Sequence, residues 1–302
     1  MLAYIISAYK DANHLARLVR RLSDTHGTDI FVHVDANVDS KPFRDLLSQR
    51  VTFVRSHHVS WGGWEQVEYQ RELLRAALAT GHNYTHIVCL SGQDYPLWTP
   101  RHIREYFAAH TDTEYLYAYN ITRGTDRGQQ SKIRVYHLLR DIRLRPLWIK
   151  HKAIVAARTL SGIMHITKPL RAPLGDGRSV DVYVGSDYFA LTPSCARYVL
   201  ETLDASPAFV NYFKTSFTPS EMCIHTIVCN SHYASHAHIH PDATYPGLAA
   251  LTPLHYINYH PVIRILTLSD LPALIDSGRM FCRKVVSGES DALVEEIDRM
   301  AL

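Results

Sequence analysis

The sequence predicts an α/β protein in which a mostly parallel sheet is flanked by helices. In the first 110 residues, short apolar segments rich in β-branched side chains alternate with amphipathic helical segments, the pattern of successive β-α-β units. The chain of 302 residues is long enough to bury a large core without disulfides or a structural metal. Its hydrophobic fraction of 46% and charged fraction of 20% are ordinary for a soluble globular chain.

Strands and helices alternate from the N-terminus. Leu15, Leu18, Val19 and Leu22 recur at helical spacing, and residues 65–79 carry a second apolar helical face. Four β-rich segments are expected to be strands, at residues 4–8, 29–34, 51–54 and 86–90. Ligands of such folds bind beyond the carboxyl ends of the strands, so we expect a site at the loops over residues 35–37 and 91–96.

The α/β pattern resumes after a basic middle segment. Residues 180–184 and 187–191 are expected to be strands, and residues 194–203 and 221–229 helices. The chain contains neither a low-complexity linker nor an internal repeat. We therefore expect a single domain over residues 1–302, with a basic amphipathic insertion at about 121–178.

The insertion concentrates the positive charge of the chain. It holds thirteen basic and three acidic residues, a net charge of +10, whereas the whole chain carries +3. Apolar side chains from Leu138 to Ile149, including Trp148, are interleaved with these charges. Two interpretations stay open: contact with an anionic membrane surface or a phosphorylated acceptor, and a solvated helical face over the core.

Several classes of protein are excluded or disfavoured. The balanced net charge does not predict nucleic-acid binding. The GxGxxG, Walker, HExxH and GxSxG motifs are absent. The five cysteines form no CxxC pair, and no apolar run is long enough for a signal peptide or a transmembrane helix. These features predict reduced, buried thiols in a cytosolic protein.

A histidine run is typical of a metal site but incomplete. His236, His238 and His240 would share one face of an extended strand, with His232 four residues upstream, and such a face could bind zinc. Pro241 follows directly, so a surface strand that runs into a turn explains the same residues, and we favour that interpretation.

An acidic loop is incomplete in a similar way. Asp35, Asn37 and Asp39 alternate as in a calcium-binding loop, but Ser40 and Leu46 stand where an EF-hand needs glycine and glutamate. The Asp-x-Asp motif of sugar-nucleotide enzymes is also imperfect, because its second position is Asn37.

Six segments in order carry a resemblance to a known family. They are residues 31–35 (FVHVD), 59–64 (VSWGGW), 90–97 (LSGQDYPL), 185–191 (GSDYFAL), 220–221 (SE) and 281–284 (FCRK). Together they resemble the core-2/I-branching β-1,6-N-acetylglucosaminyltransferase family, which includes the peptide O-xylosyltransferases. The resemblance implies a Rossmann-like mixed sheet of GT-A type, a UDP-sugar donor, inversion at the anomeric carbon, and catalysis without a bound metal or other cofactor.

The resemblance also suggests a setting for the reaction. Animal members of the family carry a membrane anchor and disulfides, and this sequence shows neither, so we expect a cytoplasmic relative of bacterial type. Its donor would be UDP-GlcNAc or UDP-xylose. Its acceptor would be a glycan hydroxyl, lipid-linked or polysaccharide, at the inner membrane face, which the enzyme would touch peripherally.

For the catalytic base, the resemblance implies Glu221. An inverting transfer needs one base to take the proton of the attacking hydroxyl. The local pattern has another explanation, because Thr218, Pro219 and Glu221 have the spacing of a helical capping box. The family position leads us to expect the base.

For the donor, the resemblance implies Arg283 and Lys284 as the cations that hold the leaving diphosphate. Arg264 is the nearest counterpart of a further family arginine, and an exposed basic pair is the alternative for Arg283 and Lys284. Asp35 would contact the uridine part. The loop that borders the donor sugar would comprise Ser91, Gly92, Gln93 and Asp94, although Asp94 could equally form a turn.

On the acceptor side, an indole of Trp61 or Trp64 could stack on a sugar face, with buried packing expected for at least one of them. Gly185 and Ser186 would shape the floor beside the acceptor. Two other functions remain as alternatives: a non-catalytic UDP-sugar or glycan-binding protein of the same fold, and a metal hydrolase that uses the histidines at 232–240.

Overall fold

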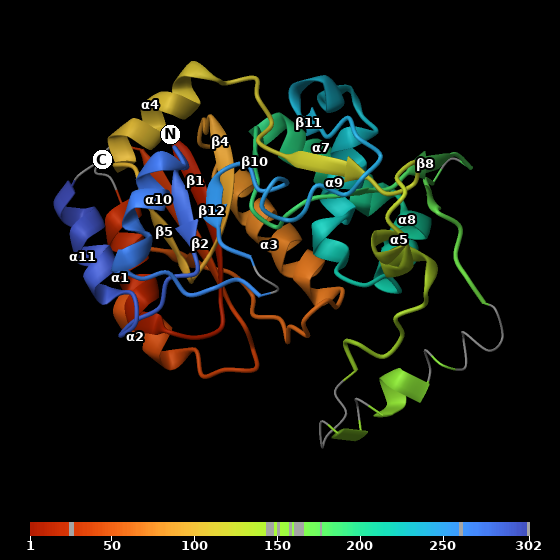
Figure 1. Ribbon diagram of the computed structural model, residues 1–302, viewed down its shortest axis with the longest axis horizontal. Helices are drawn as coiled ribbons and strands as arrows, with labels where there is room; N and C mark the ends of the chain where they lie inside the picture. Colours follow the sequence, from red (N-terminus) through yellow and green to blue (C-terminus); the bar gives the residue numbers. More distant parts are fainter. Residues whose placement is uncertain are drawn as a thin grey trace.

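The structure is a computed structural model that describes residues 1–23, 27–142, 148–149, 152–156, 159, 166–175, 177–259 and 262–300. A five-stranded sheet in the order β10-β4-β1-β2-β3 forms its centre (Figure 1). Strand β1 (Leu2–Ala8) pairs in parallel with β2 (Thr28–Val34) and with β4 (His86–Ser91). Strand β3 (Thr52–Phe53) extends this parallel arrangement, and only β10 (Ala190–Leu191) is antiparallel.

Helices cover both faces of this sheet, which explains why β1 is apolar at almost every position. Alternate β1 residues face opposite sides. Ala3 and Ile5 pack in one core with α3 (Glu65–Ala79), whereas Tyr4 and Ile6 pack in another with α1 (Ala12–Leu22). The second core also holds side chains of α2 (Lys41–Leu47) and α4 (Pro100–Ala109), and the first holds those of α7 (Pro193–Ala205), α8 (Pro207–Lys214) and α9 (Cys223–Cys229).

Three small sheets flank the central one. Strand β13 (Phe281–Arg283) lies between β12 (His255–Ile257) and β5 (Asp94–Pro96). Strand β6 (Tyr117–Asn120) lies between β9 (Tyr183–Val184) and β11 (His238–Ile239). A hairpin joins β7 (Arg171–Pro173) to β8 (Ser179–Asp181). The β12-β13-β5 sheet brings the C-terminal part of the chain against the loop that follows β4.

Shorter helices complete the described fold. They are α5 (Arg127–Arg134), η1 (Pro219–Glu221), η2 (His232–His236), η3 (Leu268–Asp270), α10 (Leu271–Asp276) and α11 (Asp291–Met300). Among the residues described here, no helix has the length and apolar character needed to cross a membrane. All five cysteines are buried and free, as the sequence predicts.

The predicted α/β fold class, a mostly parallel sheet flanked by helices, is confirmed. The helix predicted over residues 65–79 coincides with α3. Several boundaries are wrong. Residues 94–96 form a strand, because β13 supplies a partner that the local sequence does not reveal. The predicted strand at 180–184 is divided between β8 and β9, and the one at 187–191 shortens to two residues. The single-domain arrangement with its insertion stays a prediction.

The two-sided burial of β1 predicts a large effect of truncation there. Ile5 is fully buried, so Ile5→Ala should lower the free energy of unfolding by about 2–5 kcal/mol, because it leaves a cavity in the core. Ile275 on α10 is 43% exposed, and Ile275→Ala should cost less than about 1 kcal/mol. Urea denaturation measures both values, and equal losses would contradict the assigned core.

Candidate active site

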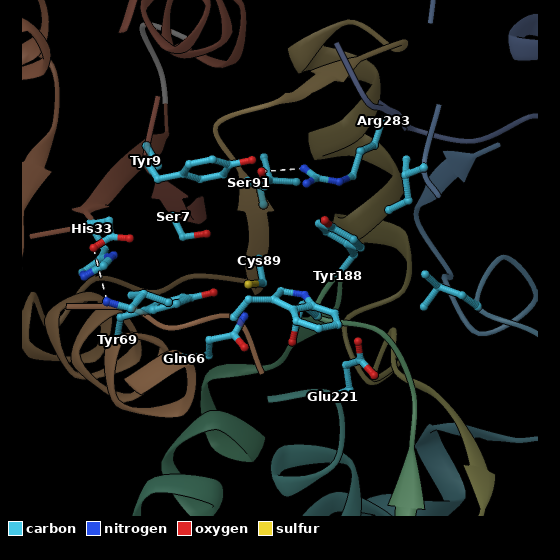
Figure 2. A pocket seen from close by; sticks show the side chains of 18 residues that line it. Ser7, Tyr9, His33, Gln66, Tyr69, Cys89, Ser91, Tyr188, Glu221 and Arg283 are labelled. Carbon is cyan, nitrogen blue, oxygen red and sulfur yellow. Dashed lines mark hydrogen bonds between the residues drawn. The ribbon is translucent and has the colours of Figure 1, made fainter. Parts of the chain in front are cut away.

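A cavity of about 530 Å³ opens beyond the carboxyl ends of β1, β2 and β4, where the fold class predicts a ligand site. Asp35 and Ser91 line it at the ends of β2 and β4, and Arg283 lines it from β13. Figure 2 shows Ser91 and Arg283 on one side of the cavity and Glu221 on the other. The structure therefore brings together residues that are far apart in the sequence. The family resemblance assigns Glu221 to the attacking hydroxyl, and Ser91 and Arg283 to the donor.

Glu221 is free of the capping role that its local sequence suggested. Thr218 makes no side-chain capping bond, and its Oγ1 is buried with no hydrogen-bond partner among the described residues. The capping-box interpretation is therefore wrong, and α9 begins only at Cys223, later than predicted. The Glu221 carboxylate instead accepts a hydrogen bond from Lys132 of α5, with Nζ 3.1 Å from Oε2.

The turn that carries Glu221 is strained and braced. Thr218 has φ 49° and ψ 54°, a left-handed conformation that costs a β-branched residue on the order of 1–3 kcal/mol. Its N–H donates to the carbonyl of Gly62 (3.2 Å). Gly62 has φ +72°, and a Cβ there would lie 2.4 Å from the Phe217 ring. The loop around Gly62 and the turn at Thr218 thus hold each other in place, and position 62 has room only for glycine.

Asp187 is a second carboxylate in the cavity, and the sequence analysis did not single it out. Burial, and then the nearby charge of Glu221, raise the pKa of Asp187 to about 6. Its Oδ1 accepts a hydrogen bond from Nε2 of Gln70 at 3.4 Å. The only sequence signal is its place inside the family segment 185–191. Two close carboxylates, one of which is easily protonated, form a proton-handling site.

Asp94 does not border the cavity as expected. It is fully buried, and its Oδ1 accepts a hydrogen bond from Nη1 of Arg283 at 2.9 Å. Nε2 of His255 lies 3.1 Å from its Oδ2, which also accepts the N–H of Ser91 at 2.6 Å. Burial opposes ionisation, but the neighbouring His255 and Arg283 outweigh it and lower the pKa of Asp94. Asp94 therefore holds the Arg283 guanidinium in place without lining the cavity itself.

Arg283 is held in place by its remaining contacts. Nη1 also donates to Oγ of Ser91 at 2.6 Å (Figure 2), and the guanidinium lies 5.3 Å from the ring centre of Tyr188. The exposed-pair alternative fails for this residue, whose side chain is only 13% exposed. Lys284 is partly exposed, and burial, Lys10 and Arg283 together lower its pKa.

Three other expected donor residues lie behind the wall of the cavity or beside it. Gly92 packs so closely on β1 that a Cβ would lie 3.1 Å from that of Ala8. Gln93 is buried and accepts a hydrogen bond from the Tyr9 hydroxyl at 2.9 Å. Arg264 forms an ion pair with Asp270, and its neighbour Ile263, rather than Arg264, lines the cavity.

The acidic loop uses its side chains to shape itself. Oδ1 of Asp35 accepts the N–H groups of Asn37 (2.9 Å) and Val59 (3.2 Å). The Asn37 amide donates to the carbonyl of Val59 at 3.0 Å, and Asp39 accepts the N–H of Lys41 at 2.9 Å. Within the described ranges, no three His, Cys, Asp or Glu side chains are grouped to hold a metal.

The two indoles have different surroundings. Trp61 is 74% exposed, lines the cavity and meets the Phe217 ring edge-on, with ring centres 5.0 Å apart. Trp64 is 5% exposed, and its Nε1 donates to Glu68 at 2.6 Å, which confirms the expectation that one indole is packed inside. Only Trp61 is available to a sugar.

Gly185 and Ser186 brace the site from below. The Gly185 N–H donates to the carbonyl of Glu221 at 2.9 Å. A Cβ at position 185 would lie 2.2 Å from Nε2 of His225, so this position has room only for glycine. Ser186 is buried.

The histidine run does not form the predicted face. His236 ends the 3-10 helix η2, whereas His238 lies in β11 and stacks near Tyr117, with ring centres 4.6 Å apart. The prediction that His236, His238 and His240 share one face of a single strand is wrong, because the chain changes conformation at Ala237.

The chain belongs to the core-2/I-branching enzyme family, whose family model matches residues 2–246. It is a glycosyltransferase, and the family implies a nucleotide-sugar donor and a glycan acceptor. The matched range includes Asp35, Asp187 and Glu221 but ends before Arg264, Arg283 and Lys284. None of the curated proteins compared matches the chain.

Solved structures show a weak likeness. Mouse xyloside xylosyltransferase 1 in its apo form is 11% identical, with 93% of this chain and 97% of that chain covered and a TM-score of 0.31. A putative glucose-1-phosphate thymidylyltransferase from Bacillus anthracis in complex with a sucrose is 13% identical (67% and 75% covered, TM-score 0.28). A mannose-1-phosphate geranyltransferase from Thermus thermophilus is 10% identical (71% and 68% covered, TM-score 0.27). At these TM-scores, no argument rests on the likeness.

The raised pKa of the partly buried Asp187 predicts a gain in stability when its charge is removed. Its pKa rises from 3.8 to about 6 on folding, so the folded state binds more protons between these values, and stability falls as the pH rises through them. Asp187→Asn should therefore raise the free energy of unfolding at pH 7–8 by about 1–3 kcal/mol, and the gain should vanish below about pH 4.

Urea denaturation across this pH range measures the effect. Asp204→Asn is the control, because Asp204 binds Arg71 and Arg75 and the loss of its charge can only weaken those ion pairs. A stability difference between Asp187→Asn and wild type that is the same at pH 4 and pH 8 would contradict the assignment.

Proposed function

We propose that this glycosyltransferase moves a sugar from UDP-GlcNAc or UDP-xylose to a glycan hydroxyl, with inversion and without a bound metal. One observation carries the proposal: Glu221 faces a single cavity from the side opposite Ser91 and Arg283. A base on one side and an anion-binding wall on the other suit direct displacement, in which the acceptor attacks from one face of the anomeric carbon and the diphosphate leaves from the other.

Glu221 is proposed to take the proton of the acceptor hydroxyl as the new glycosidic bond forms. The bond from Lys132 holds the carboxylate in one orientation. Burial and the charge of Glu221 raise the pKa of the neighbouring Asp187 to about 6, so below that pH the cavity carries one carboxylate charge rather than two. Trp61 is proposed to stack on the acceptor sugar, while Gly185 and Ser186 keep the Glu221 turn in place.

Arg283 and Lys284 are proposed to hold the diphosphate as negative charge develops on it. Ser91, which touches Arg283, would border the donor sugar, and Asp94 keeps Arg283 directed at the cavity. Asp35 would accept hydrogen bonds from ribose hydroxyls through Oδ2, for which the described residues supply no partner. Since Oδ1 of Asp35 and Oδ1 of Asp39 already accept backbone N–H groups, fixed cations are proposed for charge balance.

The acceptor is proposed to be a lipid-linked or polysaccharide glycan at the cytoplasmic face of the inner membrane, in a bacterial surface pathway. The basic segment at 121–178 supports this part. Trp148 is 60% exposed, with the Lys152 ammonium 5.1 Å from its ring centre, and Leu138 and Ile142 are also exposed. Exposed aromatic and aliphatic side chains beside cations suit the surface of an anionic bilayer.

Removal of the base tests the core of the proposal. Glu221→Gln should reduce transfer at least 100-fold, because the general base is lost, yet leave UDP affinity within about twofold of wild type. UDP release is measured with a panel of UDP-sugars, with and without EDTA, and UDP affinity by calorimetry. Glu295→Gln, at an exposed position of α11, is the control.

Each result has a definite meaning. Turnover of one donor that EDTA does not change supports the metal-free transferase. Turnover lost with EDTA would contradict metal independence and turn attention to Asp35, Asn37 and Asp39. UDP binding with no transfer from any donor to any glycan tried would favour the non-catalytic alternative.

The membrane contact has a separate test. Charge reversal of Arg140, Arg143 and Arg145 should weaken sedimentation with anionic liposomes at least tenfold, because it removes the attraction to the bilayer. Arg143 and Arg145 lie outside the described residues. Reversal of three exposed residues elsewhere, Arg20, Arg55 and Arg197, is the control. Unchanged liposome binding in the first variant would refute the proposed contact.

A further inference from the structure

The charge of Arg283 is already balanced inside the protein. Its guanidinium donates to the buried carboxylate of Asp94 at 2.9 Å and to Ser91 at 2.6 Å. A diphosphate that arrives at this wall therefore meets a neutral ion pair, which can donate hydrogen bonds but adds little net positive charge. Since a leaving diphosphate needs net positive charge nearby, other cations must supply it.

Lys10 lies two residues after the end of β1. The preceding Tyr9 lines the cavity, and its hydroxyl donates to Gln93 of the loop after β4 at 2.9 Å. The following Asp11 accepts hydrogen bonds from the N–H (2.8 Å) and the hydroxyl (2.7 Å) of Ser287. The contacts of Tyr9 and Asp11, the residues on either side, thus restrain the backbone at Lys10. The exposed Lys10 ammonium lies 5.6 Å from the ring centre of Tyr9.

Lys284 occupies the matching place on the C-terminal segment. Arg283 before it touches Ser91, and Val285 after it donates its N–H to the carbonyl of Gln93 at 2.9 Å. The segments 9–11, 91–93 and 283–287 therefore run together along one rim of the cavity. Lys10 and Lys284 belong to the two outer segments, each next to a residue that lines the cavity.

The like charges at this rim oppose one another. The pKa of Lys284 is lowered by its partial burial and then by the charges of Lys10 and Arg283, whereas Glu289 acts weakly in the opposite direction. Within the described part of the chain, neither lysine forms an ion pair. Crowded cations with little compensation are a place where an anion is stabilised.

The acidic residue that follows Lys10 in the sequence does not pair with it. Asp11 is adjacent to Lys10, but both of its oxygens are directed away, towards Ser287 and the N–H of His14 (3.0 Å). It caps α1 rather than pairing with the lysine.

We propose that Lys10 is a donor-binding residue, whose ammonium acts with Lys284 to hold the diphosphate of the nucleotide sugar while Arg283 supplies oriented hydrogen bonds. This inference rests on the proposed UDP-sugar donor. It adds to the site a cation from the N-terminal part of the chain, so that segments far apart in the sequence would bind the same diphosphate.

The test compares UDP, uridine and inorganic pyrophosphate by calorimetry on the full chain. Lys10→Gln should raise the Kd for UDP about tenfold and leave the Kd for uridine unchanged, because only UDP carries the diphosphate. Lys10→Arg should stay within about threefold of wild type for UDP. Lys41→Gln, the same chemical change at an exposed position of α2, should bind all three probes like wild type.

The outcomes separate this inference from the proposed function. Equal effects of Lys10→Gln on UDP and uridine, or no effect on either, overturn the role of Lys10 while the UDP-sugar proposal stands. Wild-type protein that binds UDP no more tightly than uridine overturns the UDP-sugar proposal instead. In that case the pyrophosphate titration tests Lys10 independently of uridine. Weaker pyrophosphate binding by Lys10→Gln supports the cation site, and unchanged binding refutes it.

Discussion

The buried ion pair between Asp94 and Arg283 is the interaction on which one wall of the cavity depends. These residues stand opposite each other in the register of β5 and β13, and both contact Ser91. Removing one partner would leave a charge buried without compensation, which is among the most destabilising changes a protein core can suffer. The pair therefore joins the C-terminal segment to the loop after β4 and holds the guanidinium at the cavity.

The opposite wall depends on a different constraint. Glu221 is placed by a left-handed threonine, by the N–H of Gly185 and by Lys132, contributions from three separate parts of the chain. The backbone strain at Thr218 is tolerated because Gly62 accepts its N–H and leaves room for Phe217. The cavity thus has one wall held by side-chain charge and another held by backbone geometry.

The sequence predicts local features of this molecule well and distant pairings poorly. Helix α3 follows from its own apolar spacing, and Glu221 and Asp35 follow from short segments that resemble the family. The strand β5 and the buried role of Asp94 do not follow, since Arg283 lies 189 positions away from Asp94. Lys132 and Asp187 escaped notice for the same reason, because their importance comes from their distance to Glu221 and not from any motif of their own.

The backbone contacts around Trp61 have a mechanical consequence. The carbonyl of Trp61 accepts a hydrogen bond from Arg140 (3.1 Å), and the next residue, Gly62, accepts the N–H of Thr218 (3.2 Å). Two hydrogen bonds to the backbone of residues 61–62 therefore connect Arg140 of the basic segment with the turn that carries Glu221. A displacement of Arg140 is therefore transmitted through the backbone of residues 61–62 to the turn that holds the Glu221 carboxylate, so the basic segment and the cavity are rigidly coupled.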